Sequence, residues 1–499
     1  MKNLQTFDIV IVVVYLFLFP CLGYWVGRKQ KTSEDYFLGG RKLRWWMVGI
    51  SMVVTDIGAL ELVGVAGSAY GMGLAMANFD WIGCVPAMVL AAFLFIPLYW
   101  KAGVYTIPEY LGRRYNDGVR TMIAILWGLF LVANLGIFLW SAATVLEVML
   151  GWPKWISILI TASVVGLYTF FGGLEAVVMA DMIQYANLMM GSIIILVVGL
   201  IKVGGIDGLV ETVQAIGGPE RKDFFHLLLP ASTTHPMSWS AVFFGLALVL
   251  SPAYWVGNQA IVQRNLGTGN ARDAKKSVLF GAALKLTIPI LIVVPGMVGF
   301  ALYPDLPEQD KIYPYMLQNM LPPGLLGLVF AGFLVVVMSG ADAYLNSAST
   351  LWTMDVYKKY IYKEADQRHL YKVGRILTAA FIGLAVLMAP LTDKFEGVFS
   401  AMQTLLSLFQ GPTFAILLLG MIWKGANSYG AIAGLVAGLI TSFTLFWIKD
   451  GIFQAANPFL FIAWWSFVMG VVVTVVVSLF TPSRPANALA ALTWSSKGS

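Results

Sequence analysis

The sequence predicts an all-α protein whose helices cross a lipid bilayer about thirteen times. Of its 499 residues, 59% are hydrophobic and 12% are charged, whereas a soluble globular domain carries about 25% charged residues. Glycine is abundant, with 50 residues, and glycine lets membrane helices pack closely. A chain of this apolar content would expose large apolar surfaces in water, so lipid is the solvent that fits the composition.

Apolar stretches of about 20 residues, the length that spans a bilayer, recur along the chain. The first is followed rather than preceded by its basic residues and ends at no small-residue cleavage site, so we expect a membrane helix there and not a signal peptide. The predicted spans are 7–27, 45–72, 78–100, 119–149, 153–172, 176–202, 238–263, 277–303, 324–355, 372–391, 395–422, 428–447 and 458–481.

Lysine and arginine residues are unequally distributed between the predicted connections. If the N-terminus lies outside, 23 of the 32 fall in inward connections, Arg114 and Arg264 among them, and 8 fall in outward ones. Because cytoplasmic loops are enriched in these residues, we expect the N-terminus outside and the C-terminus in the cytoplasm, across the plasma or inner membrane. Anionic lipid then accounts for the basic balance without a nucleic-acid partner.

Several charged side chains lie within predicted spans, where an ionised group costs about 2.5–3.5 kcal/mol. They are Asp56, Glu61, Asp80, Asp181, Lys285 and Asp342. Charged residues in membrane helices usually mark an ion or solute pathway. A single one could instead lie near an interface or form a structural pair, and Asp80 suits that alternative, but it does not account for all six.

Polar residues and glycine interrupt two of the predicted helices. The stretch 51–61 places Asp56 and Gly58 in mid-helix, and the stretch 251–259 contains Pro252. A broken membrane helix frees backbone carbonyls that can coordinate a cation, and proline removes a backbone donor and disturbs the preceding turn. We therefore expect both helices to be broken near the middle of the membrane.

The two breaks fall at corresponding places in two blocks of five spans. Each block opens with an interrupted helix, and the blocks enter the membrane with opposite orientation, which predicts an inverted repeat with a binding site at mid-membrane. No sequence identity between the blocks is evident, so this prediction rests on topology and on the breaks. The expected organisation is a leading helix with an inner loop (1–44), the first repeat (45–203), an extracellular loop (204–237), the second repeat (238–422), and two trailing helices with a short cytoplasmic tail (423–499).

From about residue 30 to 440 the chain resembles the sodium/solute symporter family, and within it the sodium–glucose cotransporter branch. The order and spacing of several short motifs carry the resemblance. They are Asp56-Ile57-Gly58, 63–67, 101–111, 172–177 with Asp181 and Gln184, 261–264 and 346–355. The resemblance implies a leucine-transporter-type five-plus-five inverted repeat that works by alternating access.

The resemblance also implies a sodium site on the first and eighth core helices. Its ligands would be the backbone carbonyls of Val54, Ile57 and Val336 and the hydroxyl of Ser339. Oxygen ligands suit a hard cation, but the next position, where the family has a second hydroxyl, is Gly340 in this chain. A second ion is implied at Asp181 with Asp342. Whether that site holds sodium or a proton, or Asp342 pairs with a basic side chain, is left open.

The solute contacts implied by the branch combine charged, amide and aromatic side chains. They are Glu61, Asp80, Ser251, Tyr254, Trp255, Lys285 and Gln403. Such groups supply both donors and acceptors for sugar hydroxyls, and an aromatic face suits the apolar side of a pyranose, although packing alone could explain the aromatic pair. Glu61 and Asp80 depart from the branch pattern, so either could change which sugar fits or pair with Lys285.

The sequence therefore predicts a sodium-coupled symporter, with Na⁺ as the coupling ion, that takes up a monosaccharide or related polyol and acts as a monomer. A sodium-coupled transporter of another small polar solute, and a non-transporting sensor or channel, are the alternatives. An enzyme is not expected, because the chain shows no histidine cluster, metal-ligand spacing, nucleophile elbow or phosphate loop. Sialic acid or an amino acid is disfavoured because no arginine is predicted at mid-membrane to hold a carboxylate.

Overall fold

The computed structural model describes residues 5–395, 397–455, 457–482, 489 and 492–494, and apart from two isolated β-bridges its regular elements are all helical. The prediction of an all-α protein is confirmed. The first half contains α1 (Thr6–Gly27), α2 (Ser33–Leu38), α3 (Trp45–Ala59), α4 (Ala66–Met72), α5 (Val85–Leu90), α6 (Ile96–Ala102), α7 (Ile107–Arg114), α8 (Asp117–Leu150), α9 (Lys154–Val203) and α10 (Gly205–Gly217). The second contains α11 (Ser251–Gly257), α12 (Gln259–Leu266), α13 (Ala271–Lys285), α14 (Ile288–Leu302), α15 (Ile312–Met320), α16 (Leu325–Leu351), α17 (Gln367–Met388), α18 (Val398–Ile422), α19 (Ser428–Ile448) and α20 (Phe459–Leu479).

Nine helical segments of the described chain are long and apolar enough to cross a membrane, and two bent pairs raise the number to eleven. Helices α1 and α16, with 22 and 27 residues, are also long enough to span a bilayer and pack against α9. The count of thirteen spans stays a prediction.

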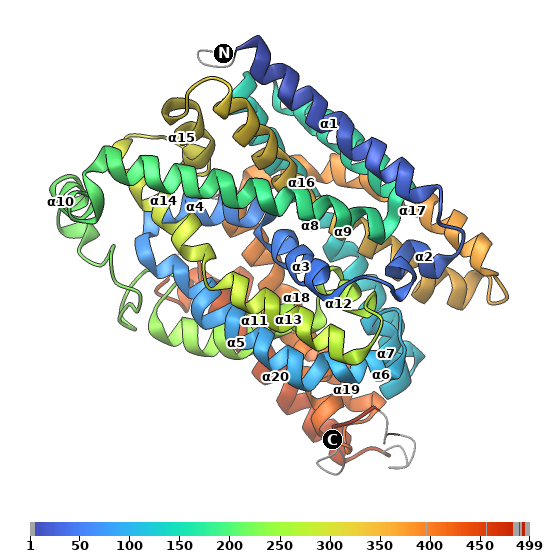
Figure 1. Ribbon diagram of the computed structural model, residues 1–499. Helices are drawn as coiled ribbons and strands as arrows, with labels where there is room; N and C mark the ends of the chain where they lie inside the picture. The colour runs from blue at the N-terminus through green and yellow to red at the C-terminus, as the bar shows by residue number, and fades with distance from the viewer. Residues whose placement is uncertain (1–4, 396, 456, 483–488, 490–491, 495–499) are drawn as a thin grey trace.

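Helices α8 and α18 form the centre of the bundle. Of the most apolar stretch of each, 72% and 78% of residues are buried, against 28% in α17 and α19. Figure 1 shows α1 along one edge, and α19 and α20 together at the end of the molecule away from the N-terminus. The peripheral helices therefore present their apolar side chains outward, as lipid-facing helices do.

The predicted spans 153–172 and 176–202 are joined in one helix, α9, which is kinked at Gly173. Gly173 has φ of 54° and ψ of −157°, a conformation that residues with a side chain rarely adopt. A Cβ atom there would also lie 2.5 Å from the Tyr36 carbonyl oxygen. Two separate constraints therefore require glycine at position 173: the backbone angles there and the close approach of α2.

Both predicted helix breaks are present. Trp45–Gly58 and Glu61–Ala77 meet at 48°, and Gly58 has non-helical angles (φ −19°, ψ −131°). Ala241–Gly257 and Gln259–Leu266 meet at 49°, where Asn258 is extended (φ −75°, ψ 116°). The second break lies within the predicted stretch 251–259, with its bend at Asn258, six residues after Pro252. Pro252 follows the π-helical stretch Ala241–Leu250 inside the continuous helical segment Ala241–Gly257, and a proline, which lacks the N–H donor, disturbs the hydrogen bonds of the preceding turn.

Arg114, assigned by the sequence to a cytoplasmic loop, is buried and closes one end of α18. Its guanidinium donates to the carbonyl oxygens of Gly420 at 2.5 Å, Trp423 at 2.8 Å and Ala426 at 3.0 Å. The last carbonyls of a helix have no partner within the helix, and a cation is favourable at this end of the helix dipole. The charge of Arg114 therefore fastens α7 to α18 instead of facing lipid headgroups.

Replacing Arg114 with methionine leaves these carbonyls unpaired, so we expect the free energy of unfolding to fall by roughly 2–3 kcal/mol. The measurement is thermal unfolding of the purified protein in detergent. The matched control is Arg113→Met, because Arg113 is half-exposed and pairs with Glu109 on the helix surface, where such pairs contribute less than about 1 kcal/mol. Equal losses in the two variants would contradict the role of Arg114.

Candidate functional site

The seven predicted solute contacts lie together around a small cavity beside the break in the first broken helix. Glu61, Ser251, Tyr254, Trp255 and Gln403 line the cavity, whose volume is about 30 Å³. They come from the π-helical turn Leu60–Val65, from α11 and from α18. The other two, Asp80 and Lys285, form an ion pair next to Glu61. Two broken helices and the central helix α18 thus converge on one polar space.

Lys285, the last residue of α13, is fully buried and contacts three carboxylates. Its Nζ lies 2.5 Å from Asp56 Oδ2, 2.5 Å from Asp80 Oδ1 and 3.3 Å from Glu61 Oε1. The suggestion that Glu61 or Asp80 pairs with Lys285 is therefore correct for both. Asp56 was recognised as an expensive charge but was absent from the predicted contacts, although its place in the interrupted stretch 51–61 was a usable signal.

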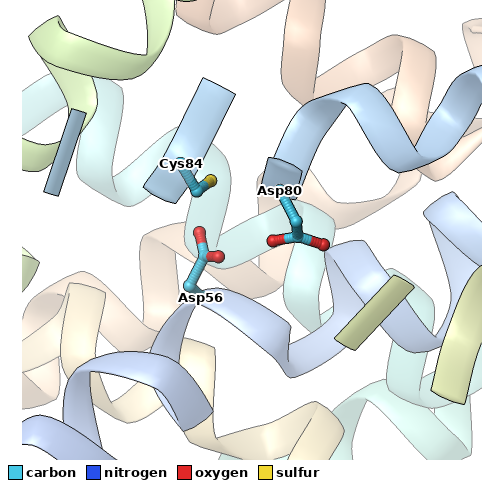
Figure 2. Close-up of side chains that lie close together, drawn as sticks. All are labelled: Asp56, Asp80 and Cys84. Atoms are coloured by element: carbon cyan, nitrogen blue, oxygen red, sulfur yellow. The ribbon is translucent and has the colours of Figure 1, made fainter. Parts of the chain in front are cut away.

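Asp56, Asp80 and Cys84 point toward one another from α3 and the π-helical turn Phe79–Cys84 (Figure 2). One ligand atom from each lies within 4.8 Å of the others, a spacing that could hold a metal ion. The ammonium of Lys285, however, already contacts the carboxylates of Asp56 and Asp80 at 2.5 Å. The cation position is occupied by this side chain, so the cluster is a buried ion-pair network rather than a metal centre.

Several polar atoms of the cavity lining have no hydrogen-bond partner among the described residues. They are Glu61 Oε2, Trp255 Nε1, Gln403 Oε1 and both amide atoms of Gln410. All four side chains are at most 3% exposed. An unsatisfied buried polar group costs about 1–3 kcal/mol, so this concentration indicates a space built to receive a polar ligand or water.

The predicted sodium ligands Val54 and Ile57 lie in the last turns of α3 directly before the break at Gly58, and both are fully buried. Helix α16 approaches the break closely, because a Cβ on Gly58 would lie 3.3 Å from the Gly340 nitrogen. The first and eighth core helices implied by the resemblance are thus in contact here. The side chains of Val336 and Ser339 lie outside the described part of the chain, so the ligand set stays a prediction.

Phe138 of α8 explains why position 340 carries no hydroxyl. A Cβ on Gly340 would lie 2.1 Å from Cε1 of the Phe138 ring, which is far inside van der Waals contact. The ring fills the space into which a serine or threonine side chain would extend. An aromatic ring therefore occupies the place of the second hydroxyl that the family resemblance implies at this position.

Asp181, a predicted ligand of a second ion, forms a buried pair with Arg264. Arg264 Nη2 lies 3.4 Å from Asp181 Oδ2, and its Nε donates to Ser51 Oγ at 2.7 Å. The Ser51 hydroxyl in turn donates to Asp181. Arg264, which the sequence assigned to an inward connection, lies in α12, and its side chain is 1% exposed. Asp342 is buried on α16, and sodium binding by either carboxylate stays a prediction.

A larger cavity of about 460 Å³ lies against the connection between α14 and α15. Asp310, in this connection, accepts a hydrogen bond from the Val398 amide at the start of α18 at 2.8 Å. Gly67 of α4 approaches so closely that a Cβ would lie 2.8 Å from Asp310 Oδ1. Burial, assisted by the nearby charge of Glu308, raises the pKa of Asp310 to about 7. The connection thus docks on both α4 and α18 through a carboxyl group that titrates near neutral pH.

Broken membrane helices around an enclosed polar site define a helical transport protein, and comparison with solved structures agrees. A Na⁺-coupled sialic acid symporter in a substrate-bound outward-open state superimposes with a TM-score of 0.83 at 21% identity, covering 96% of this chain and 99% of that one. A nucleobase-cation-symport-1 family transporter in a closed conformation gives 0.58 at 13% identity, covering 91% and 97%. The predicted leucine-transporter-type fold is confirmed.

The model of the sodium:solute symporter family matches residues 36–438, so the chain belongs to this family and is a sodium-coupled membrane symporter, not an enzyme. It is 33% identical to a sodium/glucose cotransporter of Vibrio parahaemolyticus, over 88% of this chain and 84% of that protein. It is 31% identical to sodium/glucose cotransporter 1 of Oryctolagus cuniculus, over 99% and 81%. It is also 31% identical to the same species' sodium/myo-inositol cotransporter 2, over 89% and 70%. The predicted family and coupling ion are confirmed.

Asp310 makes the stability of the protein depend on pH. Between about pH 4 and pH 7 the folded state retains a proton that the unfolded chain has lost, so stability falls as the pH rises through this window. We expect wild type to lose roughly 1–2 kcal/mol between pH 5.5 and 7 relative to Asp310→Asn, which keeps an acceptor for Val398. Thermal unfolding at several pH values measures this. Asp207→Asn, on the exposed side of α10, is the control and should behave as wild type, and identical pH profiles for wild type and Asp310→Asn would refute the assignment.

Arg264→Gln leaves the carboxylate of Asp181 buried without its cation, which typically costs 3–5 kcal/mol. We expect the double variant Asp181→Asn/Arg264→Gln to be more stable than Arg264→Gln alone, because the pair is removed as a unit. Thermal unfolding of wild type, both single variants and the double variant measures the coupling. The control is Arg272→Gln on the exposed start of α13. Additive losses would show that the two residues do not act as a pair.

Proposed function

We propose that this symporter couples the inward sodium gradient to uptake of a sugar or related polyol by alternating access. The observation that carries the proposal is the group of unpaired donors and acceptors on Glu61, Trp255 and Gln403 around one enclosed cavity. The names of the sodium/glucose and sodium/myo-inositol relatives support a polyhydroxylated solute. We further propose a monomer in the plasma or inner membrane, with its N-terminus outside and its C-terminus in the cytoplasm.

In this proposal the polar side chains bond solute hydroxyls and the aromatic pair covers the ring. Glu61, Gln403 and Ser251 line the cavity, while Asp80 and Lys285 lie behind Glu61 in the ion-pair network. The rings of Tyr254 and Trp255 lie edge to face with centroids 5.7 Å apart. A cavity of about 30 Å³ holds a water molecule or two, not a monosaccharide. Solute binding therefore requires α11 and α18 to move apart from the first broken helix.

Sodium would bind where α3 and α16 meet, through Val54, Ile57, Val336 and Ser339, with Asp181 and Asp342 as the candidates for a second ion. A cation shared by two helices favours the conformation in which those helices are close, and this links the ion to the opening of the solute site. We place the two repeats at 45–203 and 238–422, with 1–44, 204–237 and 423–499 outside them.

Charge argues against an anionic solute. The cavity wall carries Asp56 and Glu61, with Asp80 behind them, and Lys285 is already engaged by all three. A solute carboxylate would enter beside several like charges in a site of low dielectric, where such repulsion is strong. The guanidinium of Arg264 would not bind such a carboxylate, because it already contacts Asp181, Ser51 and the Ala260 carbonyl. A neutral or positively charged polar solute fits the site better.

The test is uptake into proteoliposomes together with thermal unfolding in the presence of glucose, galactose or myo-inositol, with and without Na⁺. We expect one solute to stabilise the protein only with Na⁺ present, and its uptake to collapse when the gradient is removed. Solute binding without uptake would instead indicate a sensor, and uptake indifferent to sodium would refute the coupling.

Gln403→Ala separates solute binding from ion binding. The variant removes a cavity-facing amide, and we expect about tenfold weaker solute affinity, or 1.4 kcal/mol, with sodium affinity changed less than threefold. Titrations of solute at saturating Na⁺, and of Na⁺ alone, measure the two affinities. Thr441→Ala on α19, away from the cavity, is the matched control and should change neither. Equal loss of both affinities would remove Gln403 from the solute site.

A further inference from the structure

The network around Lys285 carries more negative than positive charge. Asp56, Glu61 and Asp80 are 5%, 3% and 2% exposed, and Lys285 is fully buried. In the described part of the chain, Lys285 is the one basic side chain within ion-pair distance of these carboxylates. Three carboxyl groups face one ammonium in a dry site, where an uncompensated charge is strongly unfavourable, so the network can accept a further positive charge, either a proton or a bound cation.

Glu61 lies farthest from the shared ammonium of the three carboxyl groups. Asp56 and Asp80 each lie 2.5 Å from Lys285 Nζ, whereas Glu61 Oε1 accepts a hydrogen bond from it at 3.3 Å. The second oxygen of Glu61, Oε2, is buried and has no hydrogen-bond partner among the described residues. Glu61 also lines the cavity in which the solute is proposed to bind. The unmet acceptor therefore belongs to the binding space itself.

The lining of the same cavity supplies a second acceptor. Gln403 Oε1, on α18, has no hydrogen-bond partner in the described part of the chain, and Gln403 is 2% exposed. The nearby Tyr254 and Trp255 present aromatic rings, whose faces attract cations. An ammonium group has three N–H donors and no acceptor. It would satisfy Glu61 Oε2 and Gln403 Oε1 together and offset the excess negative charge.

We propose that the preferred solute carries an ammonium group, as an amino sugar or an aminated polyol does, and that this group binds between Glu61 and Gln403. The inference rests on the proposed uptake of a sugar or polyol and narrows its substrate class. The remaining hydroxyls would bond the unpaired amide of Gln410 and the Trp255 Nε1–H. A neutral sugar would bring no further positive charge to Glu61, which shares the one ammonium of Lys285 with Asp56 and Asp80.

The experiment compares glucosamine with glucose and with N-acetylglucosamine, and galactosamine with galactose, in titrations of the purified protein in saturating Na⁺. At about pH 6.5 the amine of an amino sugar is protonated, while acetylation removes the charge and keeps the ring. We expect an amino sugar to bind at least tenfold more tightly than both its parent sugar and its N-acetyl derivative, and to compete with radiolabelled solute in proteoliposomes by the same factor.

Glu61→Gln tests whether the charge of Glu61 produces this preference. The substitution keeps the shape of the side chain and removes its charge, so the ratio of amino sugar to parent sugar affinity should fall by about tenfold. Glu308→Gln, outside the cavity, is the control and should keep the wild-type ratio. Because the comparison of ligands in wild type already decides the matter, a variant that fails to fold does not remove the test.

The outcomes separate the two proposals. Sodium-dependent binding of a neutral sugar with no gain from the amino group would overturn the inference and leave the proposed uptake of a sugar intact. A preference for the amino sugar that persists unchanged in Glu61→Gln would overturn the assignment of the binding group. Binding of no sugar, aminated or neutral, at any sodium concentration would refute the proposed function itself.

Discussion

The ammonium of Lys285, buried without solvent contact, is the constraint on which the central architecture depends. It ties α13 to Asp56 on α3, to Glu61 in the π-helical turn that follows, and to Asp80 in the turn Phe79–Cys84. A buried charge that loses its partner costs several kcal/mol, so these segments are held at fixed separation. A solute bound at the proposed site would act on this network, because Asp56 and Glu61 line the cavity. The same charged groups therefore hold the helices in position and contribute to the proposed solute site.

The two helix breaks make space for the ion-pair network of Lys285 inside the helical bundle. At Gly58 and at Asn258 the backbone leaves the helical path, and polar main-chain groups become available in the interior. Such irregular backbone is tolerated at membrane depth only where it lines a protein-enclosed or wet space. The bend after Gly58 directs Glu61 toward the cavity, while Val54 and Ile57 remain on the α16 side. One interruption thus serves the proposed ion site and the proposed solute site on opposite sides of the same helix.

Composition and residue pattern predicted the helical class, both broken helices and the unusual buried charges. Pairing could not be predicted, since Lys285 and Glu61 lie 224 positions apart in the chain and periodicity carries no information about such contacts. Arg114 and Arg264 could not be placed in full for a related reason. Counting basic residues assigns both to inward connections, but it does not reveal that their guanidinium groups are buried and bind carbonyl oxygens and Asp181 inside the bundle. The exact position of the second bend, at Asn258 and not at Pro252, was likewise not predictable from the residue pattern.

The contact between Phe138 and Gly340 restricts which substitutions the protein can accept at these two positions. A serine at position 340 would collide with the phenylalanine ring, so the hydroxyl is accessible only to a sequence that first acquires a smaller residue at position 138. The smaller residue alone would leave a cavity between α8 and α16 and weaken their packing. Each single step is unfavourable although the pair of changes is compatible. The residue at this edge of the proposed ion site is thus constrained by the packing of Phe138, and positions 138 and 340 are expected to vary together among descendants of this sequence.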